Sequence, residues 1–213
     1  MNFAEQIGLR GVAVYRNALS VAEQEGLVDA VRAVARVAPM FHPVTRWGKE
    51  MSVKMTSAGA FGWVSDRRGY RYEPVHPKGM AWPVIPPEVL QVWDGFAPGA
   101  MGAADGVDDL RQPECCLINY YGEGARMGLH QDRDEADFSQ PVVSVSLGDE
   151  GLFRVGSVER GGKTESLWLG SGDVVVLGGA ARLVHHGVDR IRFGSGRLLK
   201  GGGRINLTLR VVT

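Results

Sequence analysis

The sequence predicts a mainly β protein of the sandwich or jelly-roll class, with a few helices outside the sheets. The second half of the chain divides into many short apolar or alternating runs separated by glycines, as in those folds. The 213 residues include 30 glycines, which favours turn-rich β structure over a helical bundle. With 44% hydrophobic and 23% charged residues, the chain resembles an ordinary soluble protein of one full-sized domain or two small ones.

The composition argues against several classes of protein. No apolar run approaches membrane-spanning length, and the N-terminus lacks the basic-then-apolar pattern of a signal peptide. Cys115 and Cys116 are adjacent and cannot link distant segments, so we expect reduced thiols in a cytoplasmic protein. The net charge of zero argues against a general nucleic-acid binder. From residue 151 to the end, ten basic residues face four acidic ones, which could meet phosphates or simply solubilise the surface.

The first elements are a strand and a helix to which we assign no chemistry. Residues 11–15 form a short apolar run that predicts a strand. Ser20 and Glu23 match a capping box, and apolar residues then recur at helical spacing until Pro39. We expect a short second helix near 88–93 and a loop over 97–109, which is rich in Gly, Ala and Asp.

Aromatic and basic residues alternate between these two helices. Aromatic faces that stack bases, with cations that meet phosphates, are what extruded or single-stranded nucleotides require. The same residues could instead form the core of a hairpin. The set comprises Trp47, Lys49, Lys54, Met55, Phe61, Trp63, Arg67, Arg68, Tyr70, Arg71 and Tyr72.

Strands are predicted through the second half, and the last one has an unusual polar face. The expected strands cover 115–121, 141–147, 152–155, 166–169, 173–177 and 204–210. Arg204, Asn206, Thr208 and Arg210 share one face of the last strand. Its two arginine Cα atoms would lie roughly 20 Å apart, which leaves room for a small dicarboxylate between the guanidiniums. The alternative is a solvated sheet face.

The spacing of His130 and Asp132 indicates a possible metal site. Two residues apart in an extended segment, their side chains leave on one face. They would supply two members of the 2-His-1-carboxylate triad that binds non-haem Fe(II), although a solvated turn also fits this pair. His185 and His186 are adjacent, so only one of them could face the same ion as a third ligand.

Taken together, these features resemble the AlkB family of Fe(II)- and 2-oxoglutarate-dependent dioxygenases, which repair alkylated nucleobases. The likeness runs from about Met51 to Arg210. It is densest at Met51-Ser-Val-Lys-Met-Thr, Leu117-Ile-Asn-Tyr-Tyr, Leu129-His-Gln-Asp-Arg-Asp-Glu, Pro141-Val-Val-Ser-Val-Ser-Leu-Gly, Gly172-Asp-Val-Val-Val and Asn206-Leu-Thr.

The resemblance implies a double-stranded β-helix (jelly roll) with flanking helices and an N-terminal nucleotide-recognition lid. We therefore expect one dioxygenase domain over 1–213, with the lid at 41–80 and the jelly-roll core at 115–213. The implied iron ligands are His130, Asp132 and His186. The implied 2-oxoglutarate site comprises Asn119, Tyr121, Arg204, Asn206 and Arg210, and the implied substrate contacts are Met55, Trp63, Tyr70, Asp134 and Arg160.

The resemblance also implies a reaction and its partners. Fe(II), 2-oxoglutarate and O2 would support oxidative demethylation of 1-methyladenine and 3-methylcytosine in DNA, single-stranded or with the base flipped, releasing succinate and formaldehyde. We expect a monomer with no membrane partner. Alternatives are the same chemistry on RNA or tRNA, a small-molecule hydroxylase, and a nucleic-acid-binding module with a structural or lost metal. The chain departs from close relatives at Ile205, Leu209 and Gly201-Gly202-Gly203, beside the co-substrate site.

Overall fold

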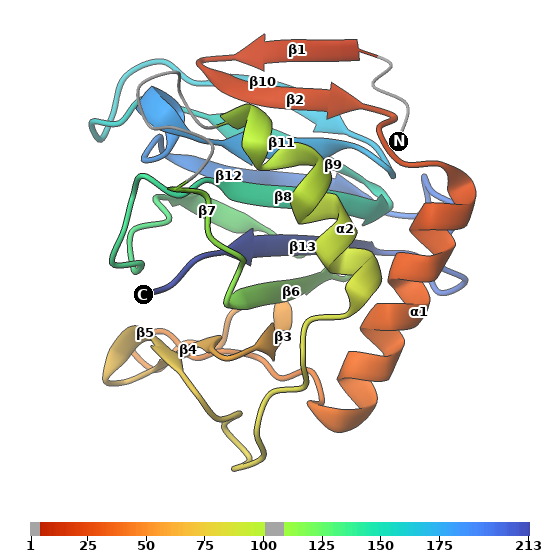
Figure 1. Ribbon diagram of the computed structural model, residues 1–213, viewed down its shortest axis with the longest axis vertical. Helices are drawn as coiled ribbons and strands as arrows, with labels where there is room; N and C mark the ends of the chain where they lie inside the picture. The colour runs from red at the N-terminus through yellow and green to blue at the C-terminus, as the bar shows by residue number, and fades with distance from the viewer. Residues whose placement is uncertain (1–4, 101–108) are drawn as a thin grey trace.

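The computed structural model of the chain describes residues 5–100 and 109–213. A seven-stranded sheet forms its centre, with every neighbouring pair of strands antiparallel (Figure 1). The strands are, in spatial order, β1 (Glu5–Leu9), β2 (Val12–Arg16), β11 (Val174–Leu177), β8 (Val142–Gly148), β13 (Arg204–Arg210), β6 (Cys115–Tyr121) and β3 (Lys54–Gly59). The predicted last strand therefore lies inside the sheet, between β8 and β6.

A second sheet faces the first across a cavity. It consists of β10 (Glu165–Leu169), β9 (Glu150–Val155), β12 (His186–Arg192) and β7 (Met127–His130), in that order. Two antiparallel sheets facing each other give the jelly roll predicted from the sequence. The strands expected at 115–121, 152–155, 166–169 and 173–177 all form, within a residue or two of the expected ends. Cys115 and Cys116 are buried and form no disulfide.

The helices cover the outer face of the large sheet, opposite the second sheet. The first helix, α1 (Val21–Val37), begins at the predicted capping box, where Ser20 and Glu23 each bond the other's backbone. The second, α2 (Pro87–Phe96), is longer than expected at both ends. Apolar residues of both helices pack against Ile205, Leu207 and Leu209 of β13. The polar face of β13 is thereby turned toward the second sheet, which decides where the site can lie.

The region that connects the helices forms a small separate sheet at the edge of the molecule. β4 (Gly62–Asp66) pairs with β5 (Gly69–Glu73), and the hairpin lies beyond β3 in Figure 1. The backbone N–H of Val44 donates to the carbonyl oxygen of Ser65 at 3.1 Å, so the chain at Val44 lies beside β4. Of the loop predicted over 97–109, residues 98–100 form a single 3-10 turn, and 101–108 lie outside the described residues.

Across 5–100 and 109–213, neither helix combines the length and apolar character that crossing a membrane requires.

Candidate active site

Strand register brings the two histidines together. His186 of β12 lies directly opposite His130 of β7, and their ring centroids are 4.7 Å apart. Directly opposed residues of antiparallel strands leave on the same face. Gly187 permits the approach of the two strands, since a Cβ there would lie 2.6 Å from the carbonyl oxygen of Met127. In this pair of residues, His186 supplies a candidate ligand, and Gly187 allows the close backbone contact that positions it.

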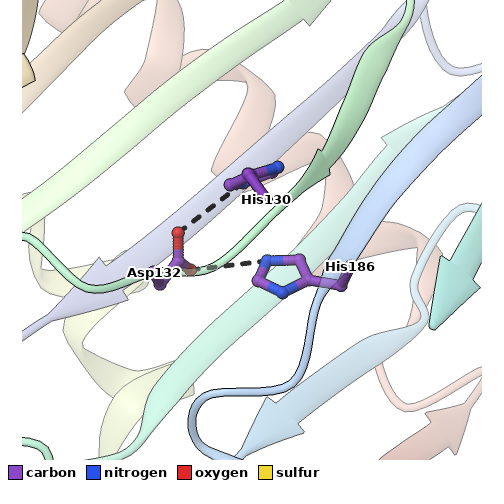
Figure 2. Close-up of side chains that lie close together, drawn as sticks. All are labelled: His130, Asp132 and His186. Carbon is purple, nitrogen blue, oxygen red and sulfur yellow. Dashed lines mark ion pairs between the residues drawn. The ribbon is translucent and has the colours of Figure 1, made fainter. Parts of the chain in front are cut away.

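Asp132 completes a triad that can hold a metal ion. Its Oδ1 lies 3.7 Å from His130 Nε2, and its Oδ2 lies 3.5 Å from His186 Nε2. The ligand atoms of all three residues fall within 4.8 Å of one another, and Figure 2 shows the three side chains converging. Oδ2 of Asp132 is buried without a hydrogen-bond partner among the described residues. A bound cation would satisfy this orphaned oxygen, so the residues fit the 2-His-1-carboxylate site predicted from the sequence.

The protonation states of the triad suit a metal ion. The Nδ1 atoms of His130 and His186 lie 2.9 and 3.0 Å from the carbonyl oxygens of Gly128 and Val184. Such bonds favour the tautomer whose Nε2 is left to bind an ion. The protein atoms around the ring and the neighbouring His186 lower the pKa of His130 to about 4. Burial opposes ionisation of Asp132, but Arg210 and His186 hold its pKa well below the usual value.

Behind Asp132 lies a buried ionic cluster that sequence reasoning did not assign. Arg210 contacts Asp132 Oδ1 at 2.9 Å, Glu135 Oε1 at 3.1 Å and the Tyr72 hydroxyl at 2.9 Å. Arg182 donates to the backbone oxygen of Asp132 at 2.8 Å and lies 3.3 Å from Glu135 Oε2. Glu135 thus joins two arginines behind the metal ligand. Its only signal in the sequence was its place at the end of the Leu129–Glu135 motif.

The opposite end of β13 holds a buried arginine without an anionic partner. Arg204 is 1% exposed, and its Nε and Nη1 have no hydrogen-bond partner in the described structure. Its Nη2 donates to Ser146 Oγ at 2.8 Å, and its guanidinium carbon lies 5.3 Å from the centre of the Tyr121 ring. Burial lowers the pKa of this guanidinium. A Cβ at Gly151 would lie 2.9 Å from Arg204 Cδ and Nε, so any other residue there would require the arginine side chain to shift.

Amide groups lie between the two arginines. Asn206 donates to Ser144 Oγ at 2.7 Å and to the carbonyl oxygen of Val145 at 3.0 Å. Asn119, opposite Asn206 on β6, keeps a buried side-chain oxygen without a partner among the described residues. A cation-lined floor with unpaired polar atoms is what a small polar anion requires.

One cavity of about 500 Å³ connects these groups with the β4–β5 hairpin. At its mouth Trp63 stacks on Tyr70, with ring centroids 5.3 Å apart, and donates from Nε1 to Asp134 Oδ2 at 2.9 Å. The alternative prediction was that these aromatics form the core of a hairpin. Trp63 and Tyr70 do stack within the hairpin, but both rings also line the cavity. The predicted site residues that line it are Met55, Trp63, Tyr70, Asn119, Tyr121, His130, Asp132, Asp134, His186, Arg204, Asn206 and Arg210.

Comparison with known proteins agrees with this geometry. Residues 11–210 match the model of the 2OG-Fe(II) oxygenase superfamily. An AlkB homologue of Caulobacter vibrioides, an alpha-ketoglutarate-dependent dioxygenase, is 52% identical over 201 residues, covering 94% of this chain and 87% of that protein. The chain belongs to the AlkB family. The Escherichia coli dioxygenase AlkB is 40% identical over 207 residues, covering 97% and 92% of the two chains.

A solved structure, that of OsALKBH1, gives the same fold. It is 31% identical to this AlkB-family chain, covers 97% of it and 99% of the solved chain, and superposes with a TM-score of 0.76. The predicted jelly roll is confirmed. As a 2OG-Fe(II) dioxygenase, the protein takes Fe(II), 2-oxoglutarate and O2, and its triad and unpartnered Arg204 fit the first two.

One predicted site residue of this AlkB-family chain, Arg160, and the unassigned His185 lie away from the cavity wall. Arg160 is an exposed residue in the β9–β10 connection and does not line the cavity. Its loop is nevertheless tied to the site, because Gln131, next to His130, donates to the carbonyl oxygen of Val158 at 3.1 Å. His185 directs Nδ1 at the carbonyl oxygen of Ser157, 3.0 Å away, so His186 alone of the pair joins the triad.

Proposed function

We propose that this AlkB-family enzyme removes methyl groups from damaged bases in DNA. The substrates are N-methylated bases such as 1-methyladenine and 3-methylcytosine, and the products are the repaired base, formaldehyde, succinate and CO2. The observation that carries the proposal is the mouth of the cavity, where Trp63 and Tyr70 offer aromatic faces beside the Asp134 carboxylate. A flat cationic base matches such a mouth better than a metabolite does.

The metal and co-substrate would be held at the base of this cavity. His130, Asp132 and His186 would hold Fe(II), which with 2-oxoglutarate and O2 supplies the oxidant that hydroxylates the methyl carbon. Arg204 would bind the distal carboxylate through its unpartnered nitrogens, with Tyr121 and Asn119 beside it. Asn206 and Arg210 would serve the opposite end of the co-substrate, where Arg210 Nε has no partner among the described residues.

The lid would select the base. Methylation on the pairing edge removes Watson–Crick bonds, so a damaged base costs less to extrude than a normal one. Trp63 and Tyr70 would stack it, Met55 would line its path, and Asp134 would favour a base that carries positive charge. Arg160 would meet a phosphate from the rim. In this scheme residues 41–80 form the lid and 115–213 the core of one domain, acting as a monomer in the cytoplasm.

The test measures formaldehyde and succinate from matched oligonucleotides. We expect release from 3-methylcytosine in single-stranded DNA, with one succinate per formaldehyde, and none from His186→Ala. In Asp134→Asn, which keeps the side-chain shape but removes the charge, the preference for cationic 3-methylcytosine over neutral 3-methylthymine should fall about 10-fold.

Other outcomes would point elsewhere. Faster turnover of the matched RNA would move the substrate to RNA. Turnover of free metabolites but of no oligonucleotide would favour the small-molecule hydroxylase. Tight oligonucleotide binding with no consumption of 2-oxoglutarate under Fe(II) and ascorbate would indicate a binding module.

A further inference from the structure

An exposed tryptophan marks the edge of the lid. Trp47 is 75% exposed, and the Arg46 guanidinium lies 4.3 Å from the centre of its ring, so a cation covers one ring face. A tight turn presents the pair: Gly48 donates to the carbonyl oxygen of Thr45 at 2.8 Å and has a φ of 83°. The turn is held by backbone hydrogen bonds, so packing of the protein does not explain why so large an apolar ring is exposed there.

The turn is fixed to the hairpin that carries Trp63. Val44 donates its N–H to the carbonyl oxygen of Ser65 at 3.1 Å, and Ser65 Oγ donates to the carbonyl oxygen of Val44 at 2.7 Å. Ser65 is two residues along β4 from Trp63, or about 7 Å. A strand that delivers a base to Trp63 therefore passes within a few nucleotides of Trp47.

Cations surround Trp47 and few acids neutralise them. Arg46, Lys49 and Arg67 are exposed and form no ion pair with any described residue. Arg67 comes close to the turn, since a Cβ at Gly48 would lie 3.5 Å from its Nη2. The guanidinium of the 75%-exposed Arg68 lies 3.5 Å from Asp66, whereas that of Arg71 lies 2.8 Å from the same carboxylate. The surface fits a polyanion that also offers flat apolar rings.

We propose that this surface, which we call the lid tip (Arg46, Trp47, Lys49, Arg67 and Arg68), binds the nucleic-acid strand flanking the target nucleotide. Trp47 stacks an unpaired base that lies two or more nucleotides from the target on its uncovered face, and the cations meet phosphates. An unpaired strand is the occupant because a paired, stacked base presents no free face to an indole. The inference rests on the proposed function and adds a second base contact, with a preference for single-stranded flanks.

Substrate length tests the stacking contact. The 2-oxoglutarate-loaded enzyme is held anaerobic with Fe(II), and its Kd is measured for a trinucleotide and a nine-nucleotide strand, each with a central 3-methylcytosine. We expect the wild type to bind the longer strand at least 10-fold more tightly. Trp47→Ala should lose most of that gain and leave the trinucleotide Kd unchanged, while Trp47→Phe should retain part of it. Because the ring is exposed, the Tm should not change.

Salt dependence tests the cations. Arg46→Gln with Arg67→Gln should lower the slope of log Kd against log salt by about 1.4 for the nine-nucleotide strand. The matched control is Arg36→Gln, an exposed arginine on α1, which should leave the slope unchanged.

The outcomes separate the two proposals. If neither substrate releases formaldehyde, the proposed function fails. If the trinucleotide is turned over but Trp47→Ala binds both strands like the wild type, the lid-tip proposal alone is overturned, and the surface would suit an acidic protein instead. Equal loss of affinity for both lengths would also overturn it, because it would place Trp47 at the target base.

Discussion

Each end of β13 carries a buried arginine, but only one of the two has carboxylate partners among the described residues. Arg204 and Arg210 share one face of one strand, and both are buried. Arg210 meets two carboxylates and a phenol, and although burial opposes its charge, Asp132 and Glu135 raise its pKa well above the usual value. Among the described residues, the Arg204 side chain donates to one side-chain acceptor, Ser146, and burial lowers the pKa of its guanidinium.

The contrast predicts a structural role for Arg210 and a binding role for Arg204. A buried cation with its anions in place belongs to the protein's own ionic network, and removing it leaves those anions unpaired. A buried cation without an anion carries a desolvation cost that a ligand carboxylate would offset. We therefore predict that the distal carboxylate of the co-substrate binds at the Arg204 end, where the guanidinium nitrogens Nε and Nη1 have no partner among the described residues.

The largest expected effect is the loss of stability in Arg210→Met. The buried Asp132 would lose its arginine partner and Glu135 would keep only Arg182, which costs roughly 3–5 kcal/mol and lowers the Tm by roughly 6–20 °C. Thermal unfolding of the metal-free protein measures it. The matched control is Arg204→Met, the same substitution on the same strand, which should leave the Tm equal or higher. A similar fall in both variants would contradict the distinction.

The next effect is on co-substrate choice in Arg204→Met. Without the guanidinium, the KM for 2-oxoglutarate should rise about 10²-fold, since breaking a buried charged pair costs roughly 2–5 kcal/mol. The KM for 2-oxobutanoate, which lacks the distal carboxylate, should change little. Succinate and propionate release measure the two, and an unchanged ratio of KM values would place the distal carboxylate elsewhere.

Glu135→Gln should weaken the metal site by roughly 10- to 100-fold in Fe(II) affinity. The substitution removes the charge that joins Arg182 to Arg210 and so loosens the groups that orient Asp132. Anaerobic titration with Fe(II) measures the Kd. Tyr72→Phe, which removes only the hydroxyl contact to the same cluster, should have a smaller effect. If both variants bind Fe(II) like the wild type, the cluster does not position Asp132.

The smallest effect is expected for Ser146→Ala. It removes the one side-chain hydrogen bond to Arg204, worth about 1 kcal/mol, so the KM for 2-oxoglutarate should rise roughly 5-fold at unchanged Tm. A rise as large as in Arg204→Met would mean that Ser146 itself contacts the co-substrate.

The sequence predicted the individual residues of the site more fully than the contacts between them. Alternation along 204–210 identified the polar face of β13, and the spacing of His130 and Asp132 indicated the metal. Whether that face contacts water or a ligand depends on what lies opposite it in the fold. Alternation along a strand distinguishes its two faces but does not tell what each face contacts. The pairing of His186 with His130 follows from the register of β7 and β12, which are neighbours in the sheet but far apart in the sequence.

The ionic cluster was missed for a related reason. Tyr72 comes from β5, Glu135 ends the Leu129–Glu135 motif, and Arg182 precedes β12. No sequence spacing links three such residues, because their contact depends on how the β4–β5 hairpin packs against the rest of the molecule. The role predicted for Arg160 remains a prediction, since that residue lies outside the cavity wall.

Gly151 has a consequence for the range of keto-acids that the enzyme accepts. A hydrogen atom stands where any other residue would place a carbon 2.9 Å from Arg204. A methyl group there would displace the guanidinium and alter the distance between it and the metal triad. We therefore expect the absence of a side chain at Gly151 to help set the length of the diacid that fits between Arg204 and the triad.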